Sequence, residues 1–283
     1  MSSSHERNDR RPGFSPRLDP LGGRRFQGRP KGLGGAGGDW IWGRHAVAAA
    51  LANPARAPFQ RLVATPEALK ALQAEKSGRE ALAASGLNPE PAANGGEVAR
   101  LLPQGAVHQG LALAAQPLEP VDLDDLADPA EGLLVMLDGV TDPQNVGAIF
   151  RSAAAFGAKG LILQDRHAPA FTGTLAKAAA GALERLPAAR VVNLARALER
   201  LADLGWRTVG LSGEAETDLA EALDGRPTVL VLGSEGEGLR RLVGEHCDVL
   251  ARIPMPGGFE SLNVSAAAAV ALYQAARSRS SGE

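Results

Sequence analysis

Short apolar runs alternate with helical stretches over the second half of the chain. Each run is bounded by glycine, proline or polar residues, a pattern typical of strands buried in a parallel sheet. The six runs are 133–137, 160–163, 190–192, 208–211, 228–232 and 249–253. This alternation predicts an α/β layered fold, and it ends with a predicted helix over 264–277 that carries small residues on one side.

A smaller α/β module is predicted before that sheet. The predicted elements are helices over 43–53 and 66–85, strands over 61–65 and 110–115, and a loop over 86–96. Pro66 stands where the first turn of a helix tolerates proline. The sequence therefore predicts a separate folded domain over residues 39–116.

Between the two α/β parts the chain becomes rich in proline and acid. Residues 117–131 hold three prolines and six acidic side chains. Such a composition is typical of a domain boundary. We therefore expect a linker over 117–131 and a second domain over 132–283.

The first 38 residues differ from the rest in charge. They carry eight Lys and Arg residues against three acidic ones, although the whole chain has a net charge of −2. With so little apolar surface, residues 1–38 are predicted to be disordered. This basic tail is either a flexible arm that binds RNA phosphates or a solvated leader without a specific partner.

Composition excludes several classes of protein. A single cysteine excludes a disulfide framework, an iron–sulfur cluster and a cysteine-based zinc site. The chain has no apolar run of the roughly 18–20 residues that a membrane span needs, and no apolar signal-peptide core. We therefore expect a soluble, cytoplasmic protein that requires no metal ion.

The first candidate motif follows the strand over 133–137 and runs L-D-G-V-T-D-P-Q-N-V-G-A-I-F-R to residue 151. Asp142 and Pro143 predict a helix start, with a capping acid and a proline at the first position. Asn145 then lies in the first helical turn, and Arg151 follows six residues later. Arg151 is either a surface salt-bridge partner or, given the apolar residues around it, a functional side chain.

The second motif, V-L-V-L-G-S-E-G-E-G-L, spans 229–239. Its glycine spacing does not match the dinucleotide fingerprint, and its two glutamates would repel a pyrophosphate. An acidic glycine turn suits hydroxyls, amines or a cationic ligand. The alternative is a flexible turn with solvated glutamates.

The third motif, I-P-M-P-G-G-F-E-S-L-N-V-S, joins the last strand to the last helix over 253–265. Ser261, Asn263 and Ser265 alternate at the helix entrance, where backbone N–H groups lack partners. Helix capping is therefore the alternative to a role in binding.

In this order the three motifs resemble those of the SpoU family of RNA 2′-O-ribose methyltransferases, in the SPOUT class. The matching runs are D-P-Q-N-V-G-A-I-F-R-S-A-A-A-F-G, L-G-S-E-G-E-G-L and I-P-M-x-G-x-x-x-S-L-N-V-S. The preceding module, with W-G-R-H-A-V at 42–47 and V-H-Q-G at 107–110, resembles the ribosomal-protein-L30e-like substrate domain of that family.

The resemblance implies an architecture and a cofactor. The parallel-sheet SPOUT domain is expected to hold a trefoil knot near its C-terminus, and S-adenosylmethionine is expected to bind in that knot. Matched by position, Gly233, Ile253 and Leu262 are the expected cofactor contacts. The family also implies a homodimer with the last helix at its interface.

The resemblance further implies a set of catalytic residues. Arg151 is the residue tied to activating the 2′-hydroxyl. Because an arginine is a poor base, we expect it to clamp an RNA phosphate and so assist proton transfer. Glu235 and Asn263 are expected to orient Arg151 and the ribose, and Asn145 is expected to contact the RNA substrate.

Histidine and cysteine have no role in the expected catalytic mechanism. His108 either touches RNA or is a structural histidine of the smaller module. Cys247 is expected to be a small buried hydrophobe.

Within the family, the two-domain arrangement is most similar to enzymes that methylate a guanosine of 23S ribosomal RNA. One alternative substrate is transfer RNA, which nothing in the sequence excludes. A second alternative is an RNA-binding protein that kept the fold and lost the chemistry. The presence of Arg151, Glu235 and Asn263 favours an active enzyme.

Overall fold

The computed structural model describes residues 40–171, 173–258 and 261–280. The basic tail over 1–38, predicted to be disordered, lies outside these residues. Among the described helices, none combines the length and the apolar character that a membrane span requires.

The larger sheet contains seven parallel strands in the order β7-β6-β5-β10-β8-β11-β9. The strands are β5 (Leu133–Leu137), β6 (Gly160–Gln164), β7 (Ala188–Val191), β8 (Arg207–Leu211), β9 (Thr217–Asp218), β10 (Thr228–Leu232) and β11 (Val249–Arg252). The parallel α/β sheet and its six predicted strands are confirmed. The short strand β9 was not predicted.

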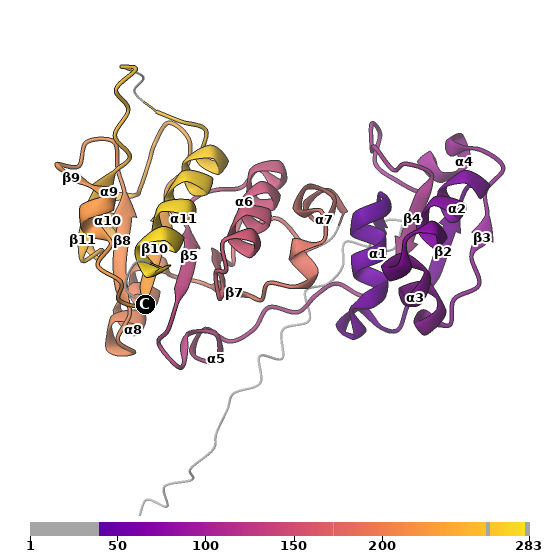
Figure 1. The fold of residues 1–283 in the computed structure, drawn as a ribbon, viewed down its shortest axis with the longest axis horizontal. Coiled ribbons are helices and arrows are strands. Elements are labelled where there is room, and N and C mark those ends of the chain that lie inside the picture. The colour runs from indigo at the N-terminus through magenta and orange to yellow at the C-terminus, as the bar shows by residue number, and fades with distance from the viewer. Residues whose placement is uncertain (1–39, 172, 259–260, 281–283) are drawn as a thin grey trace, which may run out of the picture. The chain divides into compact units, whose positions relative to one another are not determined.

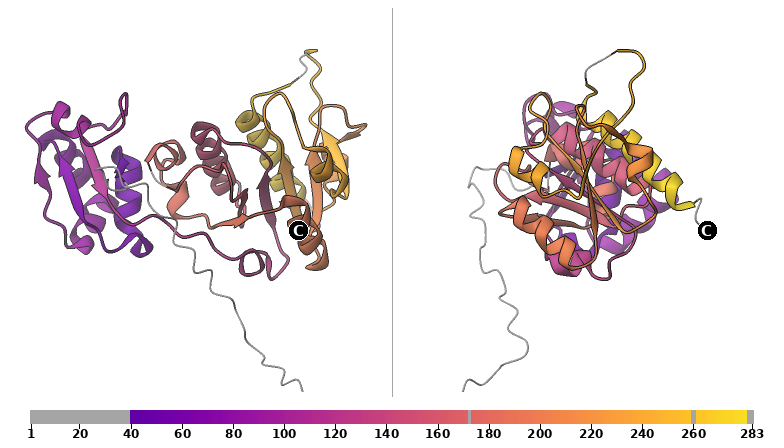
Figure 2. Two further views of the ribbon diagram at one scale, coloured as in Figure 1. Left: turned by 180° about the vertical axis from the view of Figure 1, so that it is seen from behind. Right: turned by 90° about the vertical axis from the view of Figure 1, so that its left-hand side faces the viewer.

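Helices cover both faces of this sheet (Figures 1 and 2). They are α5 (Leu123–Ala127), α6 (Pro143–Ala155), α7 (Gly173–Ala179), α8 (Leu194–Asp203), α9 (Leu219–Ala222), α10 (Arg241–Glu245) and α11 (Val264–Ser280), with a 3₁₀ turn at Ala182–Glu184. Along β5, Leu133 and Val135 join the core under α6, α7 and α11, whereas Leu134 and Met136 join the core under α5 and α8. A strand buried on both faces is apolar at every position, which explains its continuous apolar run.

The smaller sheet has the order β1-β4-β2-β3, with only β2 and β3 parallel. Its elements are β1 (Trp40–Trp42), α1 (Arg44–Ala52), a 3₁₀ turn at Pro54–Arg56, β2 (Arg61–Ala64), α2 (Pro66–Ala74), α3 (Lys76–Ser85), β3 (Glu90–Pro91), α4 (Gly95–Ala99) and β4 (Leu111–Ala114). The strands β1 and β3 and the helix α4 were not predicted.

The prediction of a single helix over 66–85 is wrong, because the helical conformation is interrupted at Glu75. Glu75 adopts extended backbone angles, with φ −80° and ψ 131°. The second helix then packs so closely on the first that a Cβ on Gly78 would lie 2.3 Å from the carbonyl oxygen of Leu72. Glycine is the residue that permits this approach.

The segment predicted as a linker contains a helix. Leu126 of α5 is buried in the core of the larger sheet, and the indole Nε1 of Trp206 donates a 2.8 Å hydrogen bond to the carbonyl of Ala127. Val121 also forms a parallel bridge with Ala189. This part of the chain therefore packs on the larger sheet.

A buried ion pair joins the smaller module to the larger sheet. Arg56 is fully buried, and its guanidinium donates to both carboxylate oxygens of Glu184, the shortest contact being 2.7 Å. Asn53 Nδ2 donates to the same carboxylate at 2.8 Å, and Arg56 Nη1 donates to the carbonyl of Gln116. Both charges therefore have several partners, as burial requires.

Removing one partner of this pair should be costly. In Glu184→Gln, the buried Arg56 loses its counter-charge, so the free energy of unfolding should fall by about 3–5 kcal/mol. The exposed pair of Arg61 and Glu90, with the same bidentate geometry, is the matched control. Glu90→Gln should cost at most about 1 kcal/mol. Urea unfolding followed by tryptophan fluorescence measures both, and equal losses would contradict the role given to burial.

Candidate active site

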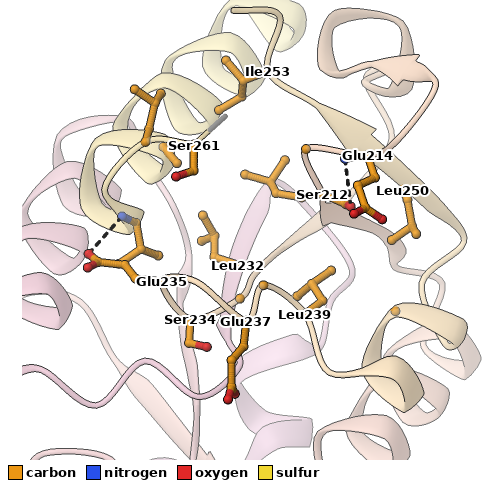
Figure 3. Close-up of a pocket in the computed structure, with 18 of the residues that line it drawn as sticks. Ser212, Glu214, Leu232, Ser234, Glu235, Glu237, Leu239, Leu250, Ile253 and Ser261 are labelled. Atoms are coloured by element: carbon orange, nitrogen blue, oxygen red, sulfur yellow. Dashed lines mark hydrogen bonds between the residues drawn. The ribbon is translucent and has the colours of Figure 1, made fainter. Parts of the chain in front are cut away.

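A cavity of about 1250 Å³ lies beyond the carboxyl ends of β8, β10 and β11 (Figure 3). Three loops form its wall, one after each strand. In open parallel sheets, ligands bind at this edge. Gly233, Ile253 and Leu262, the three expected cofactor contacts, all line this cavity.

The loop after β10 is a tight turn closed by its own backbone. Ser234 and Gly238 exchange two hydrogen bonds of 3.1 and 3.0 Å. A Cβ on Gly233 would lie 2.1 Å from the carbonyl carbon of Gly238, so no larger residue fits. Gly236 and Gly238 have φ values of +84° and +68°, which favour glycine. The glycines are thus explained by the turn itself.

Asp138, at the end of β5, holds both ends of this loop. Its backbone N–H donates to the carbonyl of Leu232 at 2.8 Å. Its fully buried carboxylate accepts hydrogen bonds from the backbone N–H of Arg240 at 2.8 Å and from Arg240 Nε at 2.6 Å. Arg240 also donates to Gln164 Oε1, which lies at the end of β6. The residues on either side of the loop over 233–239, Leu232 and Arg240, are therefore both fixed to Asp138.

Three residues from the three motifs meet in one polar network. Glu235 Oε1 accepts hydrogen bonds from Asn145 Nδ2 at 3.1 Å and Asn263 Nδ2 at 2.5 Å, and Asn263 Nδ2 also approaches Asn145 Oδ1 at 3.1 Å. The backbone N–H of Val264 donates to the same glutamate oxygen at 3.4 Å. The structure thus brings together three of the residues that the sequence singled out.

Each asparagine of the network is fixed by a helix start. Asp142 caps α6 by accepting from the N–H groups of Gln144 and Asn145. Asn263 caps α11, because its Oδ1 accepts from the N–H groups of Ser265 and Ala266. Asn263 therefore has both of the roles that the sequence left open, capping and site formation.

Arg151 does not join this network, so within the single chain the structure does not bring it together with Glu235 and Asn263. Arg151 follows Asn145 by six residues on α6, which places it about 9 Å further along the helix axis and about 240° around it. Arg151 is consequently exposed on a different side of the helix. Across the described residues its guanidinium has neither a hydrogen bond nor an ion pair, so the surface salt bridge considered for it is also absent.

The glycine of the first motif is explained by helix packing. A Cβ on Gly147 would lie 2.4 Å from the Cβ of Ala178 and 2.9 Å from the backbone nitrogen of Ala179. The helices α6 and α7 therefore touch at this point. Gly147 acts through packing and not as a ligand contact.

Sequence reasoning missed one wall of the cavity, the turn after β8. Ser212 and Glu214 line the cavity there, and the backbone N–H of Ser212 donates to the carbonyl of Ala251 on β11. The only available signal was the position of S-G-E directly after a predicted strand. With this turn included, the described residues that line the cavity contain four glutamates and one arginine, Arg241.

The other reactive side chains have structural partners. His108 Nδ1 accepts a hydrogen bond from the backbone N–H of Gly110, before β4. The Cys247 thiol donates to the carbonyl of Val243, and burial raises its pKa to about 12, so it stays protonated at neutral pH. Over the residues that the structure describes, no three His, Cys, Asp or Glu side chains are arranged to hold a metal ion.

Known proteins match the chain over most of its length. Residues 132–273 match the SpoU rRNA Methylase family. A 23S rRNA (guanosine-2′-O-)-methyltransferase RlmB from Xylella fastidiosa is 45% identical over 85% of this chain and 96% of its own. An uncharacterized tRNA/rRNA methyltransferase from a Mycobacterium species is 49% identical over 62% of this chain and 58% of its own.

The fold also matches solved structures. The SpoU methyltransferase AviRb from Streptomyces viridochromogenes, solved in complex with the cofactor AdoMet, superposes with a TM-score of 0.69. It is 27% identical, and the match covers 86% of this chain and 91% of AviRb. The family expected from the three motifs is therefore confirmed. This chain belongs to the SpoU rRNA methylase family.

Proposed function

We propose that this protein transfers a methyl group from S-adenosylmethionine to the ribose 2′-hydroxyl of a guanosine in 23S ribosomal RNA. The observation that carries the proposal is the 45% identity to a 23S rRNA (guanosine-2′-O-)-methyltransferase over 96% of that enzyme. The network of Asn145, Glu235 and Asn263 beside the cavity supports an active site. A ribosomal RNA substrate implies that the protein works in the cytoplasm.

The cavity fits S-adenosylmethionine in shape and charge. Its apolar wall includes Leu232, Leu250 and Ile253, which suit an adenosine group, and its glutamates suit a ligand that carries positive charge. The tight turn after β10 forms one wall of the cavity. When bound, S-adenosylmethionine supplies a methyl group on a positively charged sulfur.

The protein must then position the ribose and remove a proton from its 2′-hydroxyl. Positioning contributes roughly 7–11 kcal/mol in well-oriented reactions. The exposed, unpaired guanidinium of Arg151 clamps an RNA phosphate, through which the hydroxyl proton is relayed. Glu235 and Asn263 hold Asn145, and Asn145 contacts the RNA.

We assign residues 39–116 to an L30e-like RNA-binding domain, 117–131 to the connecting segment and 132–283 to the methyltransferase domain. The basic tail over 1–38 acts as an RNA-binding arm. Support for the first assignment comes from the four-stranded sheet, which has its own core around Trp40, Trp42 and Val98.

We further assign a trefoil knot and a dimer to the methyltransferase domain. The strand β11 lies beyond β8, yet α11 packs on α6, so the chain after β11 must cross the edge of β8, β10 and β5. On α11, Val270 and Tyr273 are 43% and 49% exposed, which suits a contact with a second copy.

Radiolabelled S-adenosylmethionine with bulk RNA tests the activity and its substrate. Label in 23S ribosomal RNA supports the proposal. Label in transfer RNA would instead favour the alternative substrate, and no label would favour an inactive RNA-binding protein. Mapping the labelled nucleotide then shows whether it is a guanosine.

Arg151→Ala should lower kcat by about 100-fold or more, because the group that fixes the phosphate is lost. Binding of S-adenosylmethionine should stay within a few-fold, since Arg151 does not line the cavity. Arg196→Ala, which removes another exposed arginine, is the control and should keep normal activity. Near-normal kcat in the Arg151 variant would contradict its assigned role.

Gly233→Ala should abolish cofactor binding without unfolding the protein, because the new Cβ collides with the backbone of Gly238. Gly244→Ala is the matched control, since Gly244 lines the same cavity and its Cβ would meet nothing within 4 Å. Calorimetry measures binding, and circular dichroism checks the fold. Equal binding by the two variants would show that the turn does not shape the pocket.

Removing residues 1–38 should weaken RNA binding and spare cofactor binding. If half of the eight basic side chains engage single-stranded RNA, the slope of log affinity against log salt should become shallower by about 3. Sequence preference should survive, because phosphate contacts carry no base information. Parallel slopes for full-length and truncated protein would identify the tail as a solvated leader.

A further inference from the structure

Of the four glutamates that line the cavity in the described part of the chain, two are already engaged. Glu235 accepts three N–H groups in the asparagine network. Glu245 forms a 2.6 Å ion pair with Arg241, the only arginine or lysine on the described wall. Glu214 and Glu237 have no side-chain hydrogen bond or ion pair within the described part of the chain.

The two unpaired glutamates point in different directions. Figure 3 shows the carboxylate of Glu237 directed away from the other labelled side chains. The carboxylate of Glu214 instead lies beside Ser212 and Leu250, on the opposite side of the site from Glu235. Glu214 is therefore the unpaired glutamate that faces the other lining residues.

The turn that carries Glu214 is held firmly. The backbone N–H of Ser212 bonds to Ala251 at 3.0 Å, and Ala215 N–H closes the turn onto the carbonyl of Ser212 at 3.3 Å. Glu214 N–H donates to Ser212 Oγ at 3.4 Å, and β9 then pairs with β11. Both ends of the turn are thus fixed to β11, and Glu214 stands at its tip.

The neighbours of Glu214 indicate which group it would meet. Leu250, which lies beside Glu214 in Figure 3, is 39% exposed, and Leu262, which is 41% exposed, lines the same cavity. Exposed apolar side chains beside a free carboxylate suit a nucleoside, whose base covers the leucines while its ribose offers two hydroxyl donors. An acidic residue on a loop after a parallel strand serves a ribose in the same way in other nucleotide-binding sheets.

We propose that Glu214 binds the ribose of the adenosine part of S-adenosylmethionine, with its carboxylate accepting hydrogen bonds from the 2′- and 3′-hydroxyls. This inference rests on the proposed function. Glu214 would then fix the adenosine end, while the network of Asn145, Glu235 and Asn263 lies at the end where the methyl group is transferred.

Calorimetry with two nucleosides tests the proposal. The probes are S-adenosylhomocysteine and 5′-methylthioadenosine, which has the same ribose but lacks the amino-acid group. In Glu214→Gln, affinity for both probes should fall by about tenfold, the effect of losing a charged hydrogen bond. Glu216→Gln, an exposed glutamate close to Glu214 in the chain that does not line the cavity, is the matched control and should bind both probes within about twofold of the wild type.

Kinetics supply a second measurement. Glu214→Gln should raise KM for S-adenosylmethionine about tenfold and leave kcat at saturation within about twofold, whereas a general loss of structure would lower kcat as well. Circular dichroism should be unchanged.

Three outcomes would overturn the inference. Weaker binding of S-adenosylhomocysteine alone would assign Glu214 to the ammonium group of the amino acid. Unchanged binding of both probes would remove Glu214 from the site. Failure of the wild-type protein to bind either probe would instead refute the proposed cofactor, and the inference with it.

Discussion

The buried carboxylate of Asp138 is the constraint on which the site depends. It ties the start of α10 to the end of β5 and through Arg240 reaches β6, while the backbone N–H of Asp138 bonds to Leu232 at the end of β10. The loop between these points contains three glycines and would otherwise have many conformations. Because its ends are fixed, Glu235 stands where two asparagines from distant parts of the chain can bond to it. A buried carboxylate thus organises a polar site that is itself exposed.

Most of the larger sheet could be predicted because its central strands β5, β6 and β10 are buried on both faces. Such strands give continuous apolar runs, as Leu133–Leu137 does, that are visible without any structure. Two of the missed strands, β3 and β9, lack this signal because they contain two residues each. The third, β1, is apolar but only three residues long, which is too short to be recognised as a strand. The break at Glu75 was missed for another reason. Glutamate and lysine favour helices, so the residues at the break itself gave no signal that the first helix ends there.

The candidate site could be predicted in part. The three motifs lie at strand ends, and topology alone brings the ends of β5, β10 and β11 to one edge of the sheet. The partners of each side chain could not be predicted. Rotation along α6 separates Arg151 from Asn145, and the turn at Glu214 belongs to no recognisable motif. Residue type therefore identified the chemistry, while the orientation of each side chain required the structure.

The side chains assigned to the proposed reaction are of two kinds: some are fixed by hydrogen bonds, and others still have donors without a partner. Glu235 Oε1 accepts three N–H donors, which engages its lone pairs, so this oxygen serves to hold its neighbours and not to accept the substrate proton. Asn145 has its Oδ1 and one Nδ2 proton engaged, which leaves its second Nδ2 proton for RNA. Arg151, exposed and unpaired among the described residues, is the charged group of the motifs that can still move to meet a phosphate. The proposed reaction mainly requires that a weakly acidic hydroxyl be placed correctly. The fixed amides of Asn145 and Asn263 and the mobile guanidinium of Arg151 fit this requirement.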